Sequence, residues 1–165
     1  FPSWEADQDL NSAMQNSVNW YFQAIDSQLG INRVQEFLNK IEYGNQTTSS
    51  NLDLYWSDFS LKISPLEQVT LLKKFNTNEF HLNFQNVFSV KNAIKIASTP
   101  NGNFYGKTGT GRVNGQDING WFIGYVETSD NSYYFATNIQ SDSNATGKKA
   151  FEITSDILKK LHIWN

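Results

Sequence analysis

The spacing of apolar residues changes near Pro100, and this change limits the possible folds more than any other feature of the sequence. Before Pro100, apolar residues recur about three or four positions apart, as they do along one face of an α-helix. After it, short aromatic and β-branched runs at residues 103–110, 120–127 and 133–139 are separated by Gly, Asn and Asp, which is typical of antiparallel strands. Residues 147–161 return to helical spacing. The chain is therefore predicted to be α+β, with its last helix packed across the sheet.

Local signals place the helices of the first half. One helix is predicted to end at Gly30, and a second covers residues 31–41, after which Tyr43-Gly44-Asn45 turns the chain. The first of these helices follows an apolar stripe of Met14, Val18, Phe22, Ile25 and Leu29.

Further helices are predicted around and after this region. Ser64-Pro65-Leu66-Glu67 combines a capping residue, a Pro at the first helical position and a Glu that follows, which predicts a helix through Lys73 or Lys74. Another helix is expected between residues 86 and 96, on one face of which lie Val87, Val90, Ala93, Ile94 and Ala97. In the last helix, the residues expected to face inward are Ala150, Ile153, Ile157, Leu158 and Leu161.

Length and composition predict a globular protein that does not bind nucleic acid. A chain of 165 residues that is 39% hydrophobic can bury a core, and its length predicts a single domain over residues 1–165. Residues 45–51 read as a surface loop within that domain. The net charge of −3 and the scattered lysines argue against a nucleic-acid partner. Apolar runs fall far short of the roughly 20 residues that cross a bilayer, so this chain is not expected to span a membrane.

The sequence contains no group that predicts a metal site. The absence of cysteine excludes disulfides, thiolate zinc sites and a Cys nucleophile. His81 and His162 are isolated, with no second ligand at metal-binding spacing. We therefore expect no metal.

The segment Lys107-Thr108-Gly109-Thr110-Gly111 is the most informative chemical feature. In a regular strand, Lys107 and Gly109 point to one face, while Thr108 and Thr110 point to the other. A small carboxylate ligand can lie along the bare backbone, while the Lys and the two hydroxyl groups meet its anionic group. On these residues alone, an ordinary glycine-rich β-turn is an equally good interpretation.

Ser17-Val18-Asn19 is the second candidate site segment. Residues two apart lie on different sides of a straight helix, so Ser17 and Asn19 cannot both point inward from one. If residues 9–16 form a short helix and the chain breaks near Ser17, the hydroxyl and the amide can converge. The simpler interpretation is that Ser17 caps a helix.

Several short motifs occur in an order that resembles two related groups of proteins. The motifs are Ser17-Val18-Asn19-Trp20-Tyr21, Tyr43-Gly44-Asn45, Tyr55-Trp56, Leu61-Lys62-Ile63-Ser64 and Lys107-Thr108-Gly109. This order is similar to that of class D β-lactamases and of the penicillin-sensor domains of BlaR/MecR receptors. The resemblance runs from about Trp4 to the end of the chain. An ordered set is much more specific than any single motif, and it implies a β-lactamase/transpeptidase-like fold with a helical subdomain.

Both groups use a Ser-x-x-Lys motif, in which the Ser is the nucleophile and the Lys, usually N-carboxylated, is its base. No Lys of this chain has a Ser three positions before it. Phe104, for example, lies three positions before Lys107. By analogy, the nucleophile is expected upstream of Phe1, so that this chain is the C-terminal portion of the domain and its fold is incomplete. The missing segment is then an expected partner. N-carboxylation of an upstream Lys is expected in the complete domain, with no other cofactor.

The resemblance implies roles for individual residues of the site. Ser17 relays a proton to the lactam nitrogen, and Lys107 tunes that Ser and attracts the substrate carboxylate. Thr108, Gly109 and Thr110 bind the substrate, with the two hydroxyl groups on its carboxylate and the Thr110 N–H as an oxyanion donor. Trp56 corresponds to a Trp whose indole N–H supports the carboxylated Lys. Tyr43-Gly44-Asn45 is expected to be architectural.

Asn19 distinguishes the possible activities. Class D hydrolases typically carry Val at this place of the motif, and the receptors often carry Asn. An Asn amide competes for hydrogen bonds beside a carboxylated Lys and makes this base easier to lose. The favoured hypothesis is therefore a sensor that is acylated by β-lactams and induces resistance, on the outer face of the bacterial membrane. The alternatives are a class D β-lactamase, secreted, and a non-catalytic binding domain of the same fold.

Overall fold

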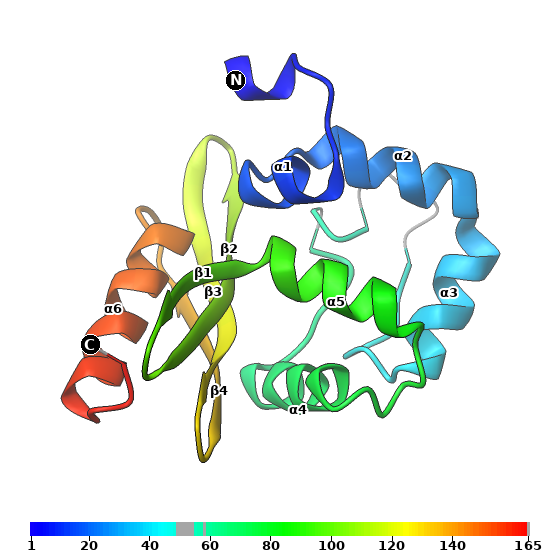
Figure 1. The fold of residues 1–165 in the computed structure, drawn as a ribbon. Helices are drawn as coiled ribbons and strands as arrows, with labels where there is room; N and C mark the ends of the chain where they lie inside the picture. The colour runs from blue at the N-terminus through cyan, green and yellow to red at the C-terminus, as the bar shows by residue number, and fades with distance from the viewer. Residues whose placement is uncertain (49–54, 58, 165) are drawn as a thin grey trace. The chain divides into compact units, whose positions relative to one another are not determined.

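A computed structural model describes residues 1–48, 55–57 and 59–164 (Figure 1). The chain divides into two compact units, which comprise Phe1–Glu67 with Lys74–Ile94, and Gln68–Lys73 with Lys95–Asn165. The first unit is helical and the second is built around an antiparallel sheet, so the predicted α+β class is confirmed. The single domain over residues 1–165 stays a prediction. Residues 49–51 of the predicted surface loop lie outside the described residues.

The first unit contains a set of helices around a small core. A 3-10 helix, η1 (Pro2–Trp4), precedes α1 (Leu10–Gln15), α2 (Asn19–Leu29) and α3 (Ile31–Lys40), and α5 (Phe84–Ala93) belongs to the same unit. Helix α1 packs against α5, and α2 packs against α3. The core cluster consists of Val34, Leu38 and Tyr55, with Tyr43, Trp56 and Leu61 packed around it.

The helical path is interrupted at Ser17, between α1 and α2. One continuous helix along the stripe from Met14 to Leu29 was expected, and this is wrong, whereas the alternative of a break near Ser17 is confirmed. Ser17 has a φ of 51°, in the left-handed region, which no helix interior can accommodate. The Val18 N–H donates to the Ala13 carbonyl at 2.9 Å, and the Val18 side chain is fully buried. Burial of Val18 therefore anchors the break.

The other helix boundaries follow local signals with one exception. Gly30, with a φ of 78°, ends α2 as predicted. The helix predicted at Ser64 is α4 (Pro65–Asn76), which continues past Lys74. Its capping box is present, because the Ser64 N–H donates to Glu67 Oε2 at 2.8 Å and the Glu67 N–H donates to Ser64 Oγ at 3.3 Å.

The exception is the helix expected between residues 86 and 96. Helix α5 begins earlier, after the Asn83 side chain accepts the Gln85 N–H at 2.9 Å, and it ends at Ala93. The following residues form strand β1 (Lys95–Thr99), in which Ala97 lies opposite Phe104. Pairing with the next strand therefore outweighs the helical spacing that included Ala97.

The second unit contains a sheet of four strands in the order β1-β2-β3-β4. Strands β2 (Gly102–Val113), β3 (Gln116–Thr128) and β4 (Ser132–Gln140) confirm the three predicted strands and extend beyond them. Asn114 and Gly115, with φ of 48° and 79°, connect β2 to β3, which is the geometry that favours Asn-Gly in a two-residue hairpin turn.

Helix α6 (Gly147–Lys160) covers one face of the sheet, as predicted (Figure 1). Ala150 and Leu158 from α6 pack with Phe104, Phe122 and Val126 from the strands. The expected inward face was partly wrong: Ile153, Ile157 and Leu161 are 40%, 47% and 61% exposed, while Thr154 is buried. The Thr154 hydroxyl is satisfied by the Ala150 carbonyl at 2.8 Å and by Thr137 at 2.7 Å, so a polar residue occupies the core face. Within the described residues, no helix is both long and apolar enough to cross a membrane.

The packing of α6 can be tested with two leucines of different burial. Leu158 is 4% exposed and Leu161 is 61% exposed. Leu158→Ala is expected to lower the free energy of unfolding by about 2–5 kcal/mol, because it removes core contacts and leaves a cavity. Leu161→Ala is the matched control and should change it by about 0.5 kcal/mol or less. Urea denaturation of both variants measures the difference, and equal losses would contradict the packing.

Candidate functional site

One edge of β2 is open over the candidate ligand-binding segment. Strand β1 pairs with β2 through Gly102–Tyr105, whereas β3 pairs with β2 along its whole length. Among the described residues, no strand pairs with the rest of β2 on the β1 side. Backbone N–H and C=O groups near Lys107 can therefore pair with an extended ligand, in the manner of an added strand.

The side chains of this segment alternate as the sequence predicts. Phe104 is in the core under α6, so the residues at even positions, including Thr108 and Thr110, lie on the α6 face. Lys107 lies on the opposite face, and its Nζ donates to the Thr108 carbonyl at 2.9 Å. Thr108, Gly109 and Thr110 are exposed. The Lys107 ammonium group thus contacts the backbone of its own strand.

The protonation equilibrium of the Lys107 side chain is shifted. Its side chain is partly buried, and burial lowers the pKa of its ammonium group below the ordinary value. A lysine that is easier to deprotonate is a feature of sites that exchange protons, although structural burial has the same effect.

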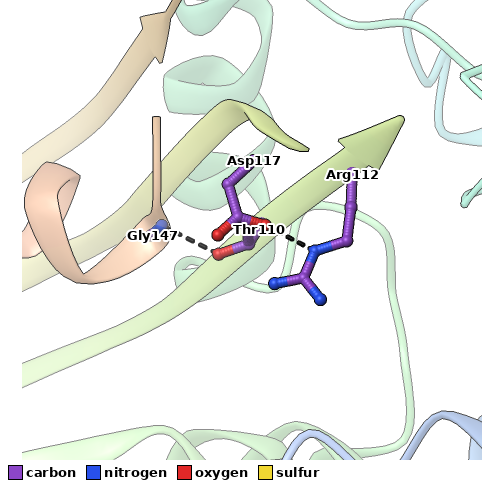
Figure 2. A network of polar contacts seen from close by, with 4 residues as sticks. All are labelled: Thr110, Arg112, Asp117 and Gly147. Atoms are coloured by element: carbon purple, nitrogen blue, oxygen red, sulfur yellow. Dashed lines mark hydrogen bonds and ion pairs between the residues drawn. The ribbon is translucent and has the colours of Figure 1, made fainter. Parts of the chain in front are cut away.

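Thr110 is held by the first turn of α6. The Gly147 N–H donates to Thr110 Oγ1 at 2.9 Å, as Figure 2 shows. The neighbouring Arg112 side chain donates to Asp117 at 2.7 Å, just after a bulge between Gly111 and Arg112. This hydrogen bond makes the largest contribution to lowering the pKa of Asp117. The strand is therefore tied on both sides of Gly111, at Thr110 and at Arg112.

Ser17 and Asn19 lie in the first unit, at the break between α1 and α2. Both residues are exposed. The interpretation of Ser17 as a helix cap is wrong, because Val18 occupies the N-cap of α2. The break itself is stabilised by Trp4, whose indole N–H donates to the Asn16 carbonyl at 3.1 Å.

Trp56 packs against the core of the same unit and donates to an acid that the sequence pattern did not single out. Its indole N–H donates to Asp26 Oδ2 at 3.2 Å. Burial, followed by the charge of Asp26 and a hydrogen bond to it, raises the pKa of the neighbouring Tyr55. Asp26 was detectable in principle, because it lies among the apolar residues Phe22 and Leu29 on the stripe of α2, where an acid needs donor partners. The predicted contact of Trp56 with a carboxylated Lys stays a prediction.

The Tyr43-Gly44-Asn45 turn is held by hydrogen bonds to the Lys62 backbone, in agreement with an architectural role. Asn45 Oδ1 accepts the Lys62 N–H at 2.9 Å, and the Asn45 N–H donates to the Lys62 carbonyl at 2.9 Å. Gly44 has a φ of 48°, and a Cβ there would lie 1.9 Å from the Lys62 oxygen. Only glycine therefore fits at position 44 of this turn.

The predicted site residues thus fall into two groups. Ser17, Asn19 and Trp56 belong to the first unit, whereas Lys107 through Thr110 belong to the second. Their convergence on one ligand stays a prediction. Among the described residues, no cluster of His, Asp and Glu forms a metal-binding group.

Comparison with known proteins identifies the family. The model of the penicillin-binding protein transpeptidase domain matches residues 1–159. The chain belongs to this family. The resemblance noted in the sequence is confirmed by a 44% identity over 163 residues to the methicillin resistance mecR1 protein of Staphylococcus aureus, which covers 99% of this chain. The chain spans 28% of the length of that protein.

Solved structures from the family have the same fold. The C-terminal domain of the Bacillus licheniformis BlaR penicillin-receptor superposes with a TM-score of 0.95 at 46% identity, over 100% of this chain and 67% of that one. A class D β-lactamase from Bacillus subtilis superposes with a TM-score of 0.91 at 38% identity, over the same shares of both chains. The fold is therefore that of the BlaR sensor domain and of class D β-lactamases.

Lys107 offers a test of the site in this chain by itself. Lys107→Met is expected to raise the free energy of unfolding at neutral pH, because Met fills a similar volume without a charge that burial penalises. The gain should shrink as the pH rises from the lowered pKa toward 10.5. In that window the folded wild type loses its proton while the unfolded chain keeps one, so wild-type stability rises with pH.

Urea denaturation at several pH values measures this effect. The matched control is Lys148→Met, because the Lys148 side chain is 85% exposed and should give no pH-dependent gain. A difference between Lys107→Met and wild type that does not vary with pH would contradict a burial effect on the charge.

Proposed function

We propose that this chain is the C-terminal part of a penicillin-sensor domain. In the complete protein, a β-lactam acylates a Ser outside this chain, and the long-lived adduct signals induction of resistance. The observation that carries the proposal is the higher similarity to the BlaR penicillin-receptor, 46% identity, than to the class D β-lactamase, 38%, over the same length. The relation to a methicillin resistance protein supports the same conclusion.

The proposed chemistry divides the work among residues of this chain. Ser17 relays a proton to the lactam nitrogen, and Lys107 assists this transfer and attracts the ligand carboxylate. Thr108 and Thr110 donate hydrogen bonds to that carboxylate. The open edge of β2 supports this assignment, because Gly109 leaves the backbone accessible and the Thr110 N–H is available there as an oxyanion donor.

Asn19 supports sensing over hydrolysis. We propose that the general base is a Lys outside this chain that reacts with CO₂ to form a carbamate. The carbamate is stable in dry, apolar surroundings. The Asn19 amide introduces beside it a polar group that competes for its hydrogen bonds. Loss of CO₂ leaves an ammonium group that cannot activate the deacylating water. The acyl group then stays on the Ser.

The proposal also assigns a place and a partner. A sensor of β-lactams acts where the antibiotic arrives, so we place this domain on the outer face of the bacterial membrane, with β-lactams as ligands. A membrane anchor would lie in another part of the protein. The segment that carries the Ser-x-x-Lys motif is the proposed structural partner of this chain.

A class D β-lactamase is the second candidate. It is favoured by the TM-score of 0.91 to a class D enzyme over the whole chain. The two functions differ in the fate of the acyl adduct, which is hydrolysed rapidly by the enzyme and retained by the sensor. A non-catalytic binding domain remains as a third candidate, which formation of an adduct would eliminate.

Mass spectrometry of the complete protein after mixing with benzylpenicillin separates these functions. The sensor should gain the mass of one antibiotic per protein and keep it, while the 165-residue chain, which has no Ser-x-x-Lys motif, should gain none. Asn19→Val should shorten the lifetime of the adduct by about tenfold or more, because it removes the competitor of the carbamate. Asn11→Val, at an exposed position of α1, is the control. Rapid, continuous hydrolysis by the wild type would contradict the sensor and support the hydrolase.

A further inference from the structure

The turn before α6 lies in close contact with strands β2 and β3. A Cβ on Gly147 would lie 2.6 Å from the Gly109 oxygen and 2.9 Å from Thr108 Cβ. A Cβ on Gly120, which is opposite Thr110 in the sheet, would lie 2.4 Å from the Thr146 oxygen. Because Gly147 and Gly120 have no side chains, this turn can approach the candidate ligand-binding segment closely.

The close approach produces one specific hydrogen bond. The Gly147 N–H donates to Thr110 Oγ1 at 2.9 Å (Figure 2). The Thr146 hydroxyl caps the same helix by accepting the Lys149 N–H at 3.2 Å. The first turn of α6 thus uses one N–H for its own cap and one for Thr110.

This bond restricts what the Thr110 hydroxyl can do. A Thr hydroxyl has one proton and two lone pairs, and one lone pair is occupied by the Gly147 N–H. The bond also determines which branch of the side chain, Oγ1 or Cγ2, faces α6. The hydroxyl proton is left to donate elsewhere, and the positive end of the α6 dipole makes the hydroxyl a stronger donor.

We infer that Gly147 is a positioning residue, which fixes the Thr110 hydroxyl so that its proton is presented to the carboxylate of the ligand. Gly147 acts through Thr110 and does not itself touch the ligand. The inference rests on the proposed function, because it takes the ligand to be a β-lactam that carries a carboxylate. It goes further in assigning part of carboxylate recognition to the first turn of α6.

The hydrogen bond can be tested in the complete protein. In a ¹⁵N–¹H spectrum, Thr110→Val should move the Gly147 amide signal to higher field and speed its hydrogen exchange, because the acceptor is gone. Thr110→Ser keeps the hydroxyl and should restore the wild-type signal. An unchanged Gly147 amide in Thr110→Val would overturn the inference.

The role in recognition is tested in the complete protein with two probes, a penicillin and its methyl ester. In Gly147→Ala the N–H remains, but the added Cβ would lie 2.6 Å from the Gly109 oxygen and must displace the turn that holds Thr110. The second-order rate of acylation by the free acid should therefore fall by about tenfold, the effect of a lost hydrogen bond between Thr110 and a charged group. The substitution should change acylation by the ester, which lacks the charge, much less. Ile157→Ala, at an exposed position of α6, is the control and should change neither rate.

The outcomes separate the inference from the function on which it rests. If the wild type forms no adduct with either probe, the proposed function is wrong. If the wild type forms an adduct and Gly147→Ala slows both probes equally, the contact is structural and the inference is overturned. Thermal unfolding of Gly147→Ala checks that the folded state persists. Thr110→Val is an independent variant, which should also slow acylation by the free acid more than acylation by the ester.

Discussion

The position of Phe122 in the core determines how the rest of the second unit is arranged. Phe122 is 1% exposed, and its ring contacts Phe104 from β2 and Phe151 from α6. A Cβ on Gly106 would lie 2.6 Å from this ring, so β2 must carry a glycine where it crosses Phe122. With Phe104 and Gly106 facing α6, the alternation of the strand places Lys107 on the other face. A shift of one residue in register would bury Lys107 in the aromatic core, which is why this register is strongly specified.

The sequence predicted those parts of the fold that depend on local signals. The capping box at Ser64, Gly30 after α2 and the Asn-Gly turn between β2 and β3 all act over a few residues, and the structure retains them. Strand β1 was missed because Ala97 fits a helical stripe equally well, and only its pairing with β2 decides the conformation. The inward face of α6 was misjudged for a related reason. Thr154 reaches Thr137, a partner on β4 that no helical pattern contains.

The candidate site shows the same division between local and tertiary information. The residue types and their order pointed to Ser17, Asn19 and the Lys107 strand, and the break at Ser17 followed from simple helix geometry. The partners of these residues could not be predicted. Asp26 meets Trp56 across 30 positions, and Gly147 meets Thr110 across 37. Such contacts depend on how elements pack, and glycine offers no side chain from which to infer a role.

Residues of the proposed site lie where the chain departs from its most stable arrangement. Ser17 adopts a left-handed conformation that costs a non-glycine residue about 1 kcal/mol. Other residues in turns also have positive φ, so this strain is informative only because it falls within a family motif. Lys107 adds a charge that burial disfavours. A chain selected for stability alone would place a glycine at the break and an apolar residue on the strand. The proposed function accounts for both costs, because it assigns the Ser17 hydroxyl group and the Lys107 cation to the reacting ligand.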